Sequence, residues 1–166
     1  RRLWLAEEEA AKKFRFVAGD VEKPRLGLAE EDFESLQGEL THVIHCAASV
    51  AFDDPYEASF RANVEGTLNA LAFSEALQQA EGSPFVAHLG IETSYIHGRQ
   101  TQDLARETEV VFPRNFYTNY YELTKAMVLV IQCSILCLVI LFTSWEKKEI
   151  TLVIRMMVTR KHTDSF

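Results

Sequence analysis

Short apolar runs alternate with helix-like stretches along this chain, and the alternation strongly limits its fold. Compact apolar runs occupy 14–18, 41–46 and 83–89, whereas helical patterns cover 29–36 and 55–79. Two parallel strands need a long crossover between them, which is usually a helix, so this order indicates parallel pairing. The sequence therefore predicts an α/β fold, a doubly wound parallel sheet flanked by helices.

Four further features refine this frame. The helix predicted at 29–36 is expected to be closed by Gly38, since glycine commonly terminates helices. Another helix is expected to begin near Tyr117, and a last strand-like run spans 150–158. Gly66 falls in the middle of the longest predicted helix, where the missing side chain allows another segment to approach closely.

Composition narrows the class of protein. A chain of 166 residues is long enough for one domain with a real core, and its net charge of −7 argues against nucleic acid as a partner. The three cysteines, an odd number, indicate a reducing compartment rather than a disulfide framework. The first residues lack the apolar stretch of a signal peptide and do not start with methionine, so we expect a fragment of a cytoplasmic protein.

Two residues on the last predicted helix form a candidate catalytic pair. Tyr121 and Lys125 lie four residues apart, so they share one face of a helix. An ammonium beside a phenol favours the phenolate, which suits protonation of a carbonyl oxygen as hydride arrives at carbon. Tyr117 and Tyr120 compete for this role, but neither has a lysine four residues on. On the residues alone, a surface tyrosine packed on a lysine stem remains the alternative.

The ends of the predicted strands supply the other candidate site residues. In doubly wound sheets, ligands bind beyond the carboxyl ends of the strands. The residues that follow the three runs are Asp20, the stretch 47–49 and Thr93, and we expect them to border one crevice with Tyr121. The structural alternatives are that Asp20 ends a strand, that Thr93 caps a loop, and that Asn63 is a polar residue on a helix surface.

Five motifs in order over residues 16–126 resemble those of the extended short-chain dehydrogenase/reductases. They are Gly19-Asp20-Val21, the run 43–48, Asn63-Val64-Glu65-Gly66-Thr67, the stretch 93–98, and the Tyr121/Lys125 pair. The spacing Ala-x-Val-x-Phe, at Ala48, Val50 and Phe52, is similar to the branch that contains fatty acyl-CoA reductases and thioester reductase domains. This resemblance implies a Rossmann-type sheet.

The resemblance also implies a reaction, the NAD(P)H-dependent reduction of an acyl thioester or a related carbonyl. Tyr121 would be the general acid to the carbonyl oxygen, Thr93 would hydrogen-bond the same oxygen, and Lys125 would assist Tyr121 and hold the nicotinamide ribose. NADP(H), or alternatively NAD(H), would supply the hydride. A nucleotide-sugar epimerase or dehydratase of the same fold is an alternative, and a truncated, non-catalytic remnant is another.

The cofactor site implied by the resemblance spans several motifs. Asp20 would contact the adenine, and Asn63 would support an active-site water or the backbone. The full set comprises Asp20, Val21, Ala47, Ala48, Ser49, Asn63 and Lys125.

The chain departs from the family pattern in two places near its site. No Gly-rich phosphate loop is present, so the predicted Rossmann-type sheet is partial and lacks its first strand. Glu92 stands where the family commonly has a serine, directly before Thr93.

A third departure follows Lys125. Residues 126–145 carry no charged side chain, and a run of this length is a candidate for membrane association. A buried interface helix and an altered tail are the alternatives. The sequence thus predicts a partial NAD(P)-binding domain over 1–125 and an atypical apolar helix and tail over 126–166.

Overall fold

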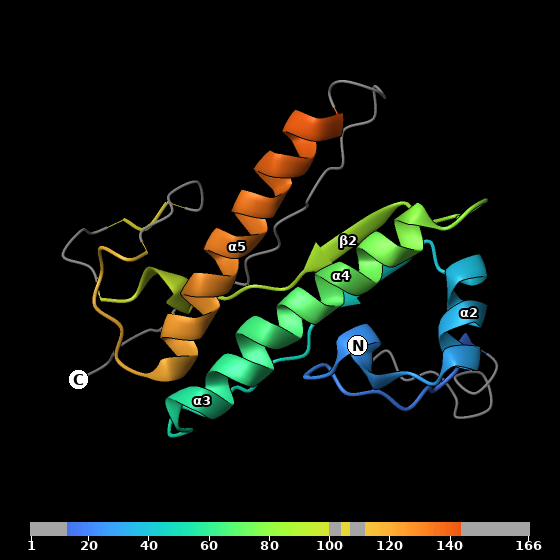
Figure 1. Ribbon diagram of the computed structural model, residues 1–166. Coiled ribbons are helices and arrows are strands. Elements are labelled where there is room, and N and C mark those ends of the chain that lie inside the picture. Colours follow the sequence, from blue (N-terminus) through green and yellow to red (C-terminus); the bar gives the residue numbers. More distant parts are fainter. Residues whose placement is uncertain (1–12, 100–103, 107–111, 144–166) are drawn as a thin grey trace, which may run out of the picture.

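A computed structural model describes residues 13–99, 104–106 and 112–143, with the side chains of the last helix described to Ser134 (Figure 1). Helices and short helical turns dominate this part of the chain. In order, the elements are η1 (Pro24–Gly27), α2 (Glu30–Glu39), β1 (His42–His45), α3 (Tyr56–Ser59), η2 (Phe60–Glu65), α4 (Gly66–Gln79), β2 (Ala87–Gly90), η3 (Ser94–His97) and α5 (Tyr120–Thr143).

The two strands pair in parallel, which confirms the predicted α/β class. His42 is paired with Ala87 and His45 with Gly90. The chain between them forms the crossover α3–η2–α4, and α4 runs alongside β2 in Figure 1. Because both strands run in one direction, their carboxyl ends meet at the same edge, where the candidate site lies.

Two small apolar clusters hold the helices in place. The first is built on Phe33 of α2 and on Phe73 and Leu77 of α4, with the two phenyl rings 5.7 Å apart in an edge-to-face arrangement. The second joins Ile96 of η3 to Ala126 and Leu129 of α5. The second cluster matters for function, because it fixes the helix that carries Tyr121 and Lys125 against the segment that follows β2.

Some predicted elements differ in the structure. The strand predicted at 14–18 is wrong: this segment is not a strand, and Phe16 is 93% exposed. A strand persists only where a neighbour satisfies its backbone groups, and within the described residues the sheet consists of β1 and β2. The third predicted strand is shorter than expected, and the run 150–158 lies outside the described residues.

Two predicted helix boundaries are also wrong, the end of α2 and the start of α5. Helix α2 continues through Gly38 to Glu39, and the amide of Leu40 closes it by donating to the carbonyl of Leu36. Gly38 has a negative φ, so it continues the helix as any residue would. Helix α5 begins at Tyr120 rather than near Tyr117, because Asn119 caps it.

The predicted long helix from 55 to 79 is continuous but not uniform. Its middle section, η2, is a π-helical segment that contains Asn63. Gly66 follows at the start of α4, and a Cβ there would stand 3.3 Å from Cγ2 of Val21. The prediction that Gly66 permits a close approach is therefore confirmed, and the approaching segment is the Gly19-Asp20-Val21 loop.

The described part of the chain contains no helix with the combined length and hydropathy of a membrane span. Residues 144 and 145, the end of the apolar run singled out in the sequence, lie outside the described residues.

We expect Gly98→Ala to destabilise the fold more than Gly82→Ala. Both glycines have a positive φ, 57° and 68°, but a Cβ at Gly98 would stand 2.5 Å from the carbonyl oxygen of Phe116, whereas nothing lies within 4 Å at Gly82. The backbone strain common to both should cost about 1 kcal/mol, and the added clash should bring Gly98→Ala to about 2 kcal/mol. Urea unfolding of the two variants measures this difference, and equal losses would contradict it.

Candidate active site

The start of α5 is fixed by two side-chain caps. Asn119 Oδ1 accepts a hydrogen bond from the backbone N–H of Glu122 at 2.9 Å, and the carboxylate of Glu122 accepts one from the N–H of Thr118 at 2.9 Å. These are reciprocal caps of the kind that terminate helices cleanly at the N-terminus. Tyr121 is therefore held in the first turn of α5, with little freedom to change its position along the helix.

Aromatic rings surround Tyr121. Its ring lies 5.5 Å from that of Phe52 and 6.4 Å from that of Tyr95, and these two rings are 6.0 Å apart. Phe52 and Tyr95 are 55% and 46% exposed, so the cluster is open to solvent on one side. It can therefore receive an apolar ligand next to the phenol of Tyr121.

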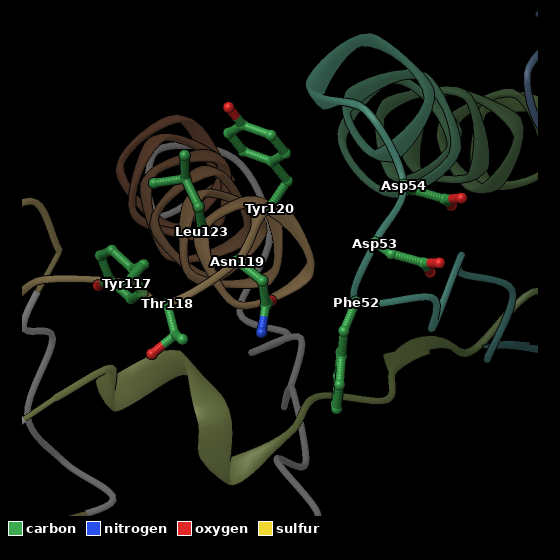
Figure 2. A pocket seen from close by; sticks show the side chains of 8 residues that line it. All are labelled: Phe52, Asp53, Asp54, Tyr117, Thr118, Asn119, Tyr120 and Leu123. Atoms are coloured by element: carbon green, nitrogen blue, oxygen red, sulfur yellow. The ribbon is translucent and has the colours of Figure 1, made fainter.

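A pocket of about 470 Å³ opens between the first turn of α5 and the loop that contains Phe52, Asp53 and Asp54 (Figure 2). Its lining comprises Phe52, Asp53, Asp54, Tyr117, Thr118, Asn119, Tyr120 and Leu123. In Figure 2 the carboxylates of Asp53 and Asp54 point away from α5. Phe52 belongs both to this pocket and to the aromatic cluster, so the pocket leads toward Tyr121.

Lys125 is buried at the carboxyl end of β2. Its ammonium donates to the carbonyl of Ile91 at 3.0 Å and forms an ion pair with Glu92 at 3.0 Å. The side chains of Lys125 and Glu92 are only 8% and 3% exposed. Because the amide of Ile91 donates to the carbonyl of His45, this region continues the pairing of β1 and β2. The lysine thus reaches the end of β2, and its role toward Tyr121 and the cofactor stays a prediction.

Asn63 joins three parts of the site. Its Oδ1 accepts from the backbone N–H of Ser49 at 2.8 Å, and its Nδ2 donates to the carbonyl of Ser49 at 3.2 Å and to Oγ1 of Thr124 at 2.9 Å. Asn63 is 1% exposed. Single π-helical turns occur frequently at functional sites, and here the turn directs a buried amide toward the loop after β1 and toward α5. The alternative of a helix-surface residue is thereby excluded.

The remaining residues after β1 lie within this arrangement. Ala47 is exposed, whereas Ala48 and Ser49 are half-buried, and the hydroxyl of Ser49 donates to the carboxylate of Asp54. Small side chains at the end of a parallel strand leave space for a ligand at the sheet edge. Their assignment to a cofactor stays a prediction.

Thr93 caps a turn. Its Oγ1 accepts a hydrogen bond from the N–H of Tyr95 at 3.3 Å, at the start of η3. This contact is the structural alternative noted in the sequence, and it also fixes the hydroxyl on the segment between Glu92 and Tyr95. The catalytic role of Thr93 stays a prediction.

Asp20 and Val21 form a turn that packs on α4. The carboxylate of Asp20 accepts from the N–H of Glu22 at 3.0 Å and pairs with Lys23 at 3.3 Å. These contacts, the backbone hydrogen bond first, hold the pKa of Asp20 below its ordinary value. The carbonyl of Val21 accepts from Asn69 at 2.8 Å. Three of the predicted cofactor residues, Val21, Ser49 and Asn63, therefore lie at η2 or the first turn of α4.

Two histidines lie beneath the site, side by side on β1 and β2. His45 contacts Oγ1 of Thr67 at 3.2 Å, Nδ1 of His88 contacts Oγ of Ser74 at 2.7 Å, and the two rings are 6.2 Å apart. Burial, assisted by the charges of His88 and Lys125, lowers the pKa of His45 to about 4. Burial also lowers the pKa of His88.

The low pKa of His45 predicts a loss of stability in acid. Its ordinary pKa is 6.5 and its folded value about 4, so the unfolded chain binds a proton more readily between these values. Folding stability should therefore fall as the pH drops from 6.5 to 4, by about 2 kcal/mol after allowance for partial solvation. Urea unfolding at several pH values tests this. His45→Gln should flatten the slope, whereas replacement of the exposed His42 by Asn should not.

Sequence reasoning missed two partners of the predicted residues. Thr124 looks like an ordinary helix residue, and its contact with Asn63 spans 61 positions, so no local pattern could reveal it. Glu92 was noticeable in the sequence, because a charged residue stands where the family commonly has a serine. Its ion pair with Lys125 was not predicted.

Comparison with known families agrees with this geometry. The sequence profile of the male sterility protein family, a family of NAD-binding domains, matches residues 1–131. The chain belongs to this family. The resemblance to the fatty acyl-CoA reductase and thioester reductase branch is therefore confirmed, and the family is one of NAD(P)-dependent reductases.

Curated relatives come from fungi, plants, animals and bacteria. The chain is 36% identical over 85 residues to the hybrid PKS-NRPS synthetase LUC5 of a Fusarium species, a match that covers 50% of this chain and 2% of the synthetase. It is 31% identical over 85 residues to fatty acyl-CoA reductase 8 of Arabidopsis thaliana, which covers 51% of this chain and 16% of that enzyme. The chain thus spans only a small part of each relative.

Solved structures support the fold. The terminal R domain from the myxalamid PKS-NRPS pathway superimposes with a TM-score of 0.63 at 27% identity, over 78% of this chain and 32% of that domain. The Bordetella bronchiseptica enzyme WbmG, solved with NAD and UDP, gives a TM-score of 0.55 at 20% identity, over 70% of this chain and 33% of that enzyme. The second likeness concerns the fold alone, which is Rossmann-like.

Proposed function

We propose that this chain carries the catalytic part of an NAD(P)H-dependent reductase that acts on an acyl thioester or a related carbonyl, with NADPH as the preferred donor. The observation that carries the proposal is the placement of Tyr121 and Lys125 on α5, with Lys125 reaching the carboxyl end of β2. The similar proteins support this substrate class: they include a hybrid PKS-NRPS synthetase, the terminal R domain of a PKS-NRPS pathway and a fatty acyl-CoA reductase.

The residues at the strand ends fit a dinucleotide by their donor chemistry. Lys125 has three N–H donors. Within the described residues one of them bonds the carbonyl of Ile91, and the ammonium forms an ion pair with Glu92, so it retains a donor for a hydroxyl group. Exposed Ala47 leaves the end of β1 uncovered. The reduced nicotinamide supplies the hydride when it is bound.

Residues of this chain would then supply the proton and stabilise the charge on the carbonyl oxygen. As the carbonyl carbon of the thioester is reduced, the phenol of Tyr121 would give its proton to the carbonyl oxygen. The C–S bond of the resulting hemithioacetal would then break, which releases the thiol and leaves an aldehyde. Thr93 would hydrogen-bond the same oxygen and stabilise the charge that develops there. Phe52 and Tyr95, packed against Tyr121, would offer an apolar surface to the acyl group.

A binding and turnover assay tests the proposal. NADPH fluorescence is titrated against the full natural protein that contains this chain, and consumption of NADPH is followed with an acyl-CoA thioester. A nucleotide sugar serves as the control substrate. We expect saturable binding below millimolar concentration and consumption with the thioester alone. Absence of binding at millimolar NADPH would instead identify a non-catalytic remnant. An epimerase or dehydratase consumes no net NADPH, so conversion of the nucleotide sugar is followed by chromatography of its products, and its turnover would indicate that alternative.

A further inference from the structure

The buried ion pair between Lys125 and Glu92 is not part of the motif pattern that led to the proposed function. It joins the second turn of α5 to the segment that follows β2, over 3.0 Å. Among the described residues, Glu92 is the acidic side chain in contact with this ammonium. His45, the other titratable group that acts on Lys125, is neutral near pH 7 because its pKa is about 4.

Stability alone gives little reason to bury such a pair. Removing two charges from water has a large desolvation cost, and well-packed apolar residues often replace a buried ion pair without loss of stability. An ion pair does, however, hold a side chain in place, because a carboxylate fixes both the charge and the position of an ammonium group. A lysine on a flexible four-carbon stem needs such a constraint if it is to present a hydrogen-bond donor at a defined point.

We propose that Glu92 is a positioning residue, which together with the carbonyl of Ile91 sets the Lys125 ammonium so that its remaining N–H is offered to a ribose hydroxyl of the cofactor. The inference rests on the proposed function and adds a residue to it. Glu92 acts through Lys125 and touches neither substrate nor cofactor.

A first test needs no cofactor. Acetylation of lysines by acetic anhydride is followed by mass spectrometry, with Lys23, whose side chain is 67% exposed, as the internal standard. Glu92→Gln keeps the shape of the side chain and removes its charge, so Lys125 should be acetylated about tenfold faster relative to Lys23. An unchanged ratio would show that Glu92 does not hold the ammonium, and would overturn the inference.

The second test is a double-mutant cycle on cofactor affinity. In the full protein, Glu92→Gln should raise the dissociation constant of NADPH about tenfold, and in the Lys125→Met background the same change should alter it less than about twofold. The KM for the thioester should stay within about twofold, a separation that general damage to the fold would not produce. An equal loss in both backgrounds would overturn the inference.

The control arms separate this inference from the proposed function. If the unsubstituted protein binds no NADPH, both fail together; if it binds NADPH and Glu92→Gln binds equally well, only the role of Glu92 fails. Should Glu92→Gln not fold, Glu92→Asp takes its place, because the shorter carboxylate keeps the charge but cannot keep the 3.0 Å contact. The affinity of Glu92→Asp for NADPH should fall when Lys125 is present and should stay unchanged in the Lys125→Met background.

Discussion

Tyr121→Phe is expected to lower the rate of thioester reduction about a thousandfold and to change the dissociation constant of NADPH by less than about twofold. The substitution removes one hydroxyl and keeps the ring that packs on Phe52 and Tyr95, at 5.5 and 6.4 Å. The aromatic cluster should therefore survive, and the loss should appear in kcat rather than in cofactor binding.

Tyr120→Phe is the matched control for this experiment. Tyr120 is the neighbouring residue on α5, lines the pocket and packs against Tyr56 with the rings 5.6 Å apart. It has no lysine four residues on, so removal of its hydroxyl should leave kcat within about threefold. A loss with Tyr120→Phe that matches the loss with Tyr121→Phe would contradict the assignment of Tyr121 as the acid. So would unchanged turnover in Tyr121→Phe.

Asn63→Ala is expected to have the largest effect on stability, a loss of about 3 kcal/mol in the free energy of unfolding. The substitution removes a 1% exposed amide that bonds the backbone N–H and carbonyl of Ser49 and the hydroxyl of Thr124. The N–H and carbonyl of Ser49 would lose partners that alanine cannot replace. Unsatisfied polar groups in the interior are among the costliest defects that a single change can introduce.

Asn69→Ala controls for the loss of an asparagine in the same helical stretch. Asn69 is only half-buried and makes one hydrogen bond, to the carbonyl of Val21 at 2.8 Å. Its replacement should cost about 1 kcal/mol. Urea denaturation gives the free energy of unfolding of both variants, with the same dependence on urea concentration used for each. Similar losses for the two would mean that the contacts of Asn63 with Ser49 and Thr124 contribute little to stability.

The sequence predicted most of the frame because its signals are local. The apolar run at 41–46 contains β1, and the glycine at 66 marks the place where Val21 approaches the helix. The Tyr121/Lys125 spacing was enough to place both residues on one helix, and the family resemblance placed that helix at the strand ends. These features depend on neighbours a few positions away, so periodicity and motif order could reveal them.

The wrong and missed features depend on distant partners. The segment 14–18 has the alternation of a strand, but a strand forms only against a neighbour, which alternation cannot supply. The ammonium of Lys125 contacts the segment after β2, 34 positions earlier at Ile91, and the sequence did not predict this contact. The assistance of Tyr121 by Lys125 stays a prediction. Which of several groups a long, flexible lysine contacts is decided by tertiary packing, and no spacing rule contains that information.

The hydrogen bonds of Asn63 have a consequence for motion. One side chain bonds both the loop after β1 and helix α5, so opening of either segment breaks a hydrogen bond of the same amide group. Local opening of native proteins occurs in cooperative units, and these bonds place the loop and the helix in one unit. Amide hydrogens of Ser49 and of the first turns of α5 should then exchange through one common opening event. The strand ends would become accessible only when the helix that carries Tyr121 also becomes mobile.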